Sequence, residues 1–179
     1  MNKRTLVNTI SLLRIPLSLL FIIFFQPEKG LFIISSSLVV VIFITDILDG
    51  FLARKYNINS VMGRHWDSLG DKSFYIAVII SFNAHGILTP IISWGLLVRE
   101  VALYITRILF YDKIDKVEQI RPYTNWHGYF MYVTIFLGLL TMYLSINKEG
   151  YDLYLYIQLS AFFALTFGVS SIFKYLSLE

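Results

Sequence analysis

Cysteine is absent from this sequence of 179 residues. Its absence excludes disulfide bonds, and it also excludes metal sites and covalent nucleophiles built on a thiol. Charged side chains are scarce as well, at 15% of residues, whereas 56% are hydrophobic and 17% are aromatic. That balance excludes an ordinary soluble domain and is typical of a chain that folds within a membrane.

The hydrophobic residues gather into runs, each long enough to cross about 30 Å of hydrocarbon as a helix of about 20 residues. The runs are bounded by polar, glycine or proline residues and fall at 6–26, 31–52, 67–85, 87–111, 127–146 and 151–175. The first run continues past Phe25 without a small-residue cleavage site, so we expect a retained helix rather than a signal peptide. The sequence predicts an all-α bundle of six transmembrane helices in a single domain, residues 1–179.

The basic residues indicate how this bundle is oriented. They lie at the predicted membrane edges rather than on one soluble face, so the net charge of +3 does not indicate nucleic-acid binding. Six spans place both termini on one side, together with Lys3, Arg4, Arg54, Lys55, Arg64, Lys72, Lys113, Lys116, Arg121 and Lys174. The opposite loops hold only Lys29 and Lys148. This asymmetry predicts a protein of the cell (inner) membrane with both termini in the cytoplasm.

Two long polar connections, 53–66 and 112–126, then lie at the cytoplasmic face, where we expect the chemistry. The opposite side has short turns. These are predicted around Pro27, Gly86 and Gly150.

Four aspartates flank the connection 53–66. Asp46 and Asp49 are three residues apart near the end of the second run, so they share one face of a helix. Asp67 and Asp71 are four residues apart at the start of the third run and also share a face. If the two helices pack side by side, all four carboxylates converge.

Carboxylates held together beside hydrocarbon repel one another and are costly to desolvate. A bound divalent cation would offset that cost, and a ligand set made only of oxygen suits Mg²⁺ or Mn²⁺. Such a cation in turn suits a diphosphate substrate, because it neutralises the charge that develops on the leaving group.

Small residues lie at the same place in the sequence. Gly50, Ala53 and Gly63 would let a bulky ligand approach the backbone between helices, and Arg54 can pair with a phosphate. The alternative interpretation is that the small residues are only packing contacts between membrane helices.

These residues form the pattern Asp46-x2-Asp49-Gly50-x2-Ala53-Arg54-x8-Gly63-x3-Asp67-x3-Asp71. The pattern resembles the full signature of the CDP-alcohol phosphotransferase family. Eight fixed positions at fixed spacing make a chance match very improbable, and the six-helix layout extends the resemblance across nearly the whole chain.

The resemblance implies a reaction in which an alcohol hydroxyl attacks the phosphorus farther from cytidine and CMP leaves. Asp71 would be the general base, and homodimers are usual in the family. The implied metal ligands are Asp46, Asp49, Asp67 and Asp71, and the implied CDP-binding residues are Asp49, Gly50, Ala53, Arg54, Gly63 and Asp67. A competing base is His65, although a histidine beside Trp66 at a membrane interface is more often an interfacial residue.

Two further segments resemble the bacterial phosphatidylglycerophosphate synthase branch: Asn8-Thr9-x4-Arg14-x-Pro16 and Arg99-Glu100-x6-Arg107. The branch implies CDP-diacylglycerol as the donor and glycerol 3-phosphate as the acceptor. Arg99 and Arg107 would bind the acceptor's phosphate, because charged residues within an apolar span face a polar cavity by default. The alternative is an internal ion pair, Arg99 with Glu100 or Arg14 with Glu100, that only orders the helices.

The sequence also departs from this branch. Ser68 and Gly70 stand where the branch more often has Pro and Ala, and the segment 121–129 lacks its Gly-Lys-x-Lys-Thr. Inositol phosphate, other polyols and serine therefore stay open as acceptors.

Three other functions compete with this hypothesis. An enzyme of the same fold can transfer the head group of a soluble CDP-alcohol to diacylglycerol, and the signature does not separate the two. A divalent-cation transporter would need its carboxylates near the bilayer midplane, whereas these aspartates lie near one end of their helices. A non-catalytic scaffold is disfavoured because the signature is complete.

Overall fold

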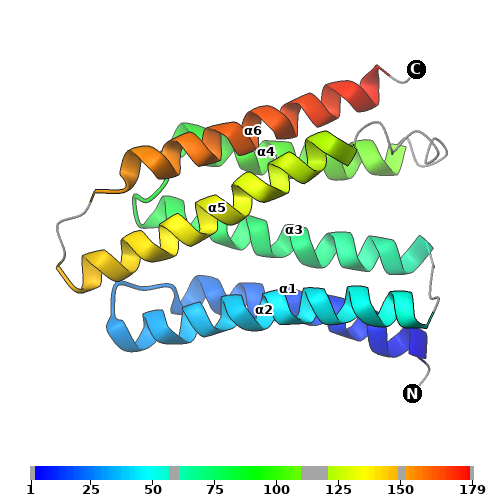
Figure 1. Ribbon diagram of the computed structural model, residues 1–179, viewed down its shortest axis with the longest axis horizontal. Coiled ribbons are helices and arrows are strands. Elements are labelled where there is room, and N and C mark those ends of the chain that lie inside the picture. Colours follow the sequence, from blue (N-terminus) through cyan, green and yellow to red (C-terminus); the bar gives the residue numbers. More distant parts are fainter. Residues whose placement is uncertain (1–2, 57–60, 110–120, 149–151, 178–179) are drawn as a thin grey trace. The chain divides into compact units, whose positions relative to one another are not determined.

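The computed structural model describes residues 3–56, 61–109, 121–148 and 152–177. This part of the chain consists of helices and short turns, without a strand (Figure 1). The helices are α1 (Lys3–Phe24), α2 (Lys29–Lys55), α3 (Val61–Ala84), α4 (Pro90–Leu109), α5 (Arg121–Ile146) and α6 (Tyr154–Leu176). The predicted all-α architecture is confirmed, because each predicted run corresponds to one helix.

Several predicted boundaries are wrong. α2 continues to Lys55 and α3 begins at Val61, so most of the connection predicted at 53–66 is helical. α5 likewise begins at Arg121, within the connection predicted at 112–126, and α2 begins at Lys29 in a predicted turn. Lysine and arginine are strong helix formers, so a helix does not have to stop where its apolar run stops. Pro122 is compatible with this start, because the first turn of a helix needs no N–H donor from it.

The turn between α3 and α4 lies where the sequence predicts it. Gly86 has a positive φ of 68°, a conformation that glycine adopts without strain. Its N–H donates to the carbonyl oxygen of Asn83 at 3.1 Å, and the N–H of Ile87 donates to the carbonyl oxygen of Phe82 at 2.8 Å. This pair of bonds is a Schellman motif, which satisfies carbonyls at the end of α3. α4 then begins at Pro90.

The surface of the helices is that of a membrane protein. Three helical segments are long and apolar enough to cross a bilayer, namely Lys29–Leu52, Pro122–Ile146 and Tyr154–Lys174, and Asn8–Phe24 is a shorter apolar segment. Large apolar side chains point outward, as at Ile47 in α2, which is 69% exposed. Such exposure is unfavourable in water over a large area but suits contact with lipid. Membrane crossing by α3 and α4 stays a prediction.

The contacts gather in two compact units, residues 1–81 and 82–179. In the first unit, Phe74 of α3 packs edge-to-face against Phe21 of α1, with ring centroids 6.1 Å apart. It also packs edge-to-face against Phe43 of α2, at 5.8 Å. Aromatic pairs of this geometry stabilise a core beyond the area that they bury. Phe74 thus joins the three helices that carry the signature and the first apolar run.

The second unit is held together by close contacts among α4, α5 and α6. Gly95 of α4 faces Leu165 of α6, where a Cβ at Gly95 would come within 2.9 Å of a leucine methyl carbon. The hydroxyl groups of Thr134 in α5 and Ser160 in α6 are 2.9 Å apart and hydrogen-bonded. Small residues and hydroxyl bonds of this kind are typical of helix packing in membranes.

Candidate active site

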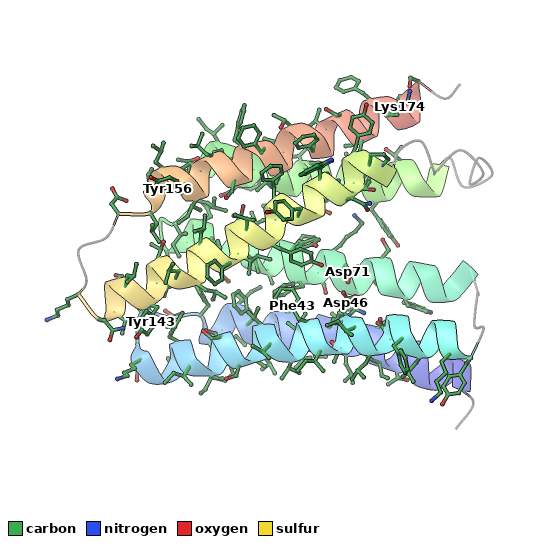
Figure 2. The ribbon with its side chains drawn as sticks, in the orientation of Figure 1. Phe43, Asp46, Asp71, Tyr143, Tyr156 and Lys174 are labelled. Atoms are coloured by element: carbon green, nitrogen blue, oxygen red, sulfur yellow. The ribbon has the colours of Figure 1, made fainter. Side chains whose placement is uncertain are left out.

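Two helices of the first unit bring three signature aspartates together. Asp46 and Asp49 lie near the end of α2, and Asp71 lies in the first half of α3. Figure 2 labels Asp46 and Asp71. The three-residue spacing puts the two α2 carboxylates on one side of the helix. The predicted convergence of α2 and α3 carboxylates is therefore present for these three residues.

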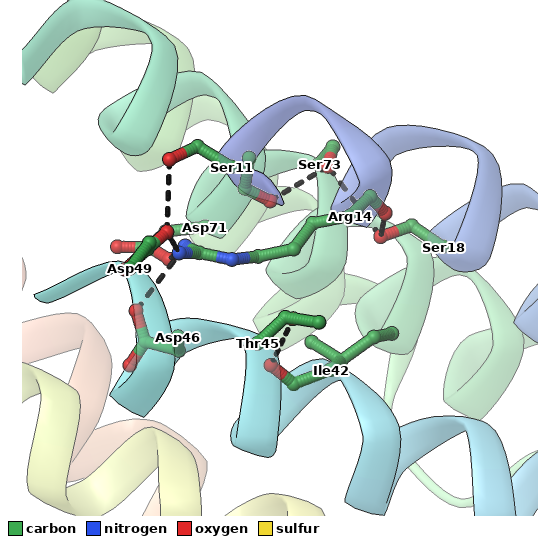
Figure 3. Close-up of polar contacts among 10 residues, drawn as sticks. Ser11, Arg14, Ser18, Ile42, Thr45, Asp46, Asp49, Asp71 and Ser73 are labelled. Atoms are coloured by element: carbon green, nitrogen blue, oxygen red, sulfur yellow. Dashed lines mark hydrogen bonds and ion pairs between the residues drawn. The ribbon is translucent and has the colours of Figure 1, made fainter. Parts of the chain in front are cut away.

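A cation from a third helix lies among them. The guanidinium of Arg14 on α1 forms ion pairs with Asp46, Asp49 and Asp71 (Figure 3). Nη1 contacts the Oδ1 atoms of Asp46, at 3.2 Å, and of Asp71, while Nη2 contacts Oδ2 of Asp49. Ser11, one turn earlier on α1, donates a hydrogen bond of 2.8 Å from Oγ to the same Asp49 oxygen. α1 is thus part of the carboxylate cluster.

The three aspartates differ in how far they can be reached. The side chain of Arg14 is only 1% exposed and that of Asp49 only 5%, so their contact is sheltered. The side chains of Asp46 and Asp71 are 40% and 44% exposed. A ligand can therefore approach Asp46 and Asp71, while Asp49 anchors the guanidinium from within.

The close approach of α3 to α1 depends on Gly70. A Cβ at this position would lie 2.6 Å from the carbonyl oxygen of Ser11 and 3.5 Å from the side chain of Arg14. Real Cβ atoms do not occur so close to a backbone oxygen, so a larger residue would move the helices apart. Gly70, one of the two positions in α3 at which the sequence departs from the bacterial branch, is thus a place where α3 lies close to the side chain of Arg14.

The sequence predicts a metal that compensates the aspartates, and the structure adds the guanidinium of Arg14 as a second compensating charge. Among the side chains that the structure describes, no group of three metal-ligating residues is arranged to hold an ion. The side chain of Asp67 lies outside that part. Three carboxylates nevertheless outnumber one guanidinium, two of them are accessible, and all their donors are oxygen. The chemistry of this donor set fits a hard divalent cation.

The second unit contains another buried polar cluster. Arg99 and Glu100 on α4 form an ion pair of 2.5 Å, and their side chains are 3% and 2% exposed. Nε2 of His127 on α5 lies 2.9 Å from Nη1 of Arg99 and 3.0 Å from Oε1 of Glu100. Nδ1 lies 2.8 Å from the carbonyl oxygen of Ala164 on α6, and because a carbonyl only accepts, Nδ1 must carry the proton.

This second cluster has the geometry of the internal ion pair that the sequence offers as an alternative for Arg99. It joins three helices, and Gly168 of α6 leaves room for it, since a Cβ there would lie 3.0 Å from Nδ1 of His127. His127 is a member that the sequence analysis misses. The sequence does contain a signal for it, because His127 is an ionisable residue within the apolar run of the fifth helix. Such a residue is costly within a membrane unless it has a partner.

Comparison with known proteins gives a consistent result. The family model described as CDP-alcohol phosphatidyltransferase matches residues 4–170. A relative from Aquifex aeolicus, named CDP-diacylglycerol--glycerol-3-phosphate 3-phosphatidyltransferase, is 34% identical over 139 residues, which cover 75% of this chain and 73% of the relative. A relative of the same name from Mycoplasma genitalium is 28% identical over 142 residues, covering 74% of this chain and 58% of that protein.

The chain belongs to the CDP-alcohol phosphatidyltransferase family. It is therefore a membrane transferase, and the resemblance found in its sequence is confirmed. The matched region includes α1 from its second residue onward and so contains Arg14 as well as the whole signature.

Among the remaining signature positions of this phosphatidyltransferase, Gly50 lies in the described part of α2. A Cβ at Gly50 would meet nothing within 4 Å, so at this glycine the small residue leaves open space rather than serving as a packing contact. The described part of the structure does not include the surroundings of Gly63 or the side chains of the other predicted residues: Ala53, Arg54, His65, Asp67 and Arg107.

Proposed function

We propose that this protein transfers the phosphatidyl group of CDP-diacylglycerol to glycerol 3-phosphate and releases CMP. The observation that carries the proposal is the convergence of Asp46, Asp49 and Asp71 in a family member that is 34% identical to a relative named for this reaction. The relative supplies the substrate pair, and the carboxylate cluster supplies a site with the required chemistry.

In the proposed reaction, a hydroxyl oxygen of the acceptor forms a bond to the phosphorus that carries the diacylglycerol. The bond from that phosphorus to the oxygen of CMP breaks, and CMP leaves with the electron pair. Asp71 accepts the hydroxyl proton. It suits this role because its side chain is 44% exposed, so the acceptor's hydroxyl group can reach the carboxylate.

A bound Mg²⁺ or Mn²⁺ would neutralise the diphosphate and stabilise the leaving CMP. The residues that would hold it are Asp46, Asp49, Asp67 and Asp71. Support comes from the excess of carboxylates over the single guanidinium in the cluster and from the exposure of two of them.

The CDP part of the donor is assigned to Asp49, Gly50, Ala53, Arg54, Gly63 and Asp67. The open space beside Gly50 supports close approach of a ligand to the α2 backbone. The sheltered contact of Asp49 with Arg14 would keep this end of α2 in place while the donor binds.

The acceptor's phosphate is assigned to Arg99 and Arg107 on α4. A phosphate gains charge-assisted, often bidentate hydrogen bonds from guanidinium groups, whereas an uncharged alcohol gains little. Positions eight residues apart are about 12 Å apart along a helix, so the two arginines would act at different depths. Arg99 already contacts Glu100 and His127, so its part in acceptor binding needs a separate test.

The site is expected to face the cytoplasm at the inner membrane, because lysine and arginine are concentrated on the side of the predicted connections 53–66 and 112–126. We also propose a homodimer, on the basis of family membership alone.

The test is CMP release by the protein purified in detergent. CDP-diacylglycerol and Mg²⁺ are supplied with glycerol 3-phosphate, inositol phosphate or serine in parallel, and a further reaction contains CDP-choline and diacylglycerol. We expect rapid CMP release with glycerol 3-phosphate, and none after chelation of the metal. A better rate with serine or inositol phosphate would overturn the acceptor, and activity only with CDP-choline would overturn the donor. Full activity in chelator would overturn the metal requirement.

A further inference from the structure

Arg14 is the buried cation of the first unit that contacts three signature aspartates, and its own helix lies outside the signature. A guanidinium that is 1% exposed is costly to bury unless carboxylates surround it. Carboxylates gathered at one place are equally costly without a cation. Each half of the cluster therefore offsets part of the cost of the other, and three carboxylates against one guanidinium still leave a negative charge for an added ion.

The position of Arg14 is built into the packing of its helix. Ser18 donates from Oγ to the carbonyl oxygen of Arg14 at 2.6 Å, and its Oγ lies 3.4 Å from that of Ser73 on α3. Gly70 gives room for the stem of the arginine. The guanidinium is thus directed at the aspartates by α1 and α3 together, as Figure 3 shows.

A divalent ion that binds these aspartates meets a site in which carboxylate oxygens already contact a cation. Nη1 of Arg14 contacts both accessible aspartates, Asp46 and Asp71, while Nη2 contacts the sheltered Asp49. The Asp49 contact is further supported by the hydrogen bond from Ser11. Of the oxygens that Arg14 contacts, those of Asp46 and Asp71 are therefore the ones that an ion can take. The contact of Asp49 Oδ2 with Arg14 can persist even when Asp49 contributes its other carboxylate oxygen to the ion.

We propose that Arg14 is the resident counter-cation of the aspartate cluster: it holds the three carboxylates together in the metal-free protein and competes with the divalent metal for their oxygens. The inference rests on the metal dependence in the proposed function. Arg14 acts through the aspartates and is a positioning residue. When metal binds, Arg14 releases Asp46 and Asp71 and keeps Asp49, so α1 stays attached to α2.

Replacing Arg14 by a neutral residue should lower the thermal stability of the protein without metal and raise its affinity for the metal. In Arg14→Gln the carboxylates repel one another without compensation, so the metal-free protein loses thermal stability. The same loss of a positive charge strengthens metal binding. A unit charge about 6 Å from a divalent ion changes its affinity about tenfold even at the dielectric constant of water. A substitution that merely damages the fold would weaken both properties.

The experiment is a titration of chelator-treated protein in detergent with Mn²⁺ alone, followed by electron paramagnetic resonance of the free ion, together with the thermal midpoint at each concentration. We expect Arg14→Gln to bind Mn²⁺ at least about tenfold more tightly than the unmodified protein, and to gain more thermal stability on binding. Arg14→Lys, which keeps the charge, should restore most of the weaker affinity. Ser35→Ala is the matched control, because Ser35 is buried in α2 and donates to Phe32, away from the cluster.

The outcomes separate the two proposals. Equal Mn²⁺ affinity in the unmodified protein and in Arg14→Gln overturns the role of Arg14 and leaves the proposed function standing. Absence of Mn²⁺ binding in both proteins overturns the metal requirement, and with it the competition, while CMP release tests the transfer reaction independently.

A second measurement covers the case in which Arg14→Gln does not fold. In the unmodified protein labelled with ¹⁵N-arginine, Mg²⁺ should speed hydrogen exchange of the Arg14 guanidinium, whose signal is identified by its loss in Arg14→Lys. Unchanged exchange at saturating Mg²⁺ overturns the release of Asp46 and Asp71.

Discussion

At the residue scale, burial divides the signature aspartates into different roles. Asp49 is 5% exposed and contacts both Arg14 and Ser11, so it serves the packing of α1 against α2 as well as the site. Asp71 is 44% exposed and belongs to a different helix. Substitution of a carboxylate by its amide removes the charge with little change in shape, and its effects should therefore differ between these positions.

We predict that Asp71→Asn lowers kcat for CMP release by about a hundredfold or more, since a positioned general base contributes typically that much. Affinity for CDP-diacylglycerol should remain measurable, whereas Asp46→Asn should also raise the metal concentration required for half-maximal rate. Steady-state kinetics at varied donor and Mg²⁺ concentrations give both quantities. Asp152→Asn is the control, because Asp152 is exposed and accepts a bond from the N–H of Tyr154, which the amide oxygen of asparagine can also accept. Retention of more than about a tenth of the rate in Asp71→Asn would remove the base assignment.

The buried ion pair of Arg99 and Glu100 in the second unit should affect thermal stability. Removing one partner leaves a buried charge uncompensated, at a cost of about 3–5 kcal/mol, whereas replacing both partners by apolar residues is often neutral. Glu100→Leu should therefore lower the thermal midpoint strongly, and Arg99→Met combined with Glu100→Leu should recover most of it. A double variant no more stable than Glu100→Leu would show that losing both contacts of His127 Nε2 outweighs the removal of the two buried charges.

The same double variant tests whether Arg99 also binds the acceptor. Loss of a charged contact to phosphate should raise the KM for glycerol 3-phosphate roughly 10- to 100-fold and leave the KM for the donor unchanged. An unchanged acceptor KM would leave the phosphate to Arg107 alone.

At the scale of the elements, the geometry of the site depends on how closely α3 approaches α1. Gly70 is the point of contact, since its Cβ would meet the backbone carbonyl of Ser11, which cannot move aside as a flexible side chain can. Any separation of the two helices also separates Arg14, which α1 carries, from Asp71, which α3 carries. Helix packing and charge pairing are therefore coupled in this unit.

Gly70→Ala is predicted to destabilise the protein by about 1–3 kcal/mol, the usual cost of overpacking, although alanine is the better helix former. Activity should fall with it, because the aspartate cluster is disturbed. Gly30→Ala is the matched control, because a Cβ at Gly30 of α2 meets nothing within 4 Å. Thermal midpoints of the two variants in the same detergent provide the comparison. Equal midpoints would mean that α1 adapts to the extra methyl group at no cost.

At the scale of the whole molecule, the helical fold and the aspartates were accessible from the sequence because both depend on local spacing. Runs of apolar residues define the helices, and the separation of Asp46 from Asp49 defines a shared face. The contacts of Arg14 depend instead on how α1 packs against α2 and α3, and no local periodicity encodes that packing. His127 and Ala164 likewise meet through tertiary structure, and helix ends such as Lys55 extend beyond the apolar runs that predict them.

The orientation of the chain in the membrane is the remaining prediction from sequence, and the absence of cysteine makes it directly testable. A single cysteine introduced at a chosen position is then the only thiol in the protein. Tyr56 and Lys148 are suitable positions, because both are exposed and lie just beyond the ends of α2 and α5. They belong to connections that the distribution of lysine and arginine assigns to opposite sides of the membrane.

Tyr56→Cys should react with a membrane-impermeant maleimide only in inside-out vesicles, and Lys148→Cys only in intact cells or right-side-out vesicles. The physical reason is that basic segments next to a span are retained on the cytoplasmic side, and few basic residues lie in the connections assigned to the outside. Labelling after detergent treatment controls for thiols that are hidden by the fold rather than by the membrane. The reverse pattern would move the aspartate cluster to the outer face, where a cytoplasmic nucleotide donor could not reach it. Labelling of both positions from the same side would instead show that one of α3, α4 and α5 does not cross the membrane.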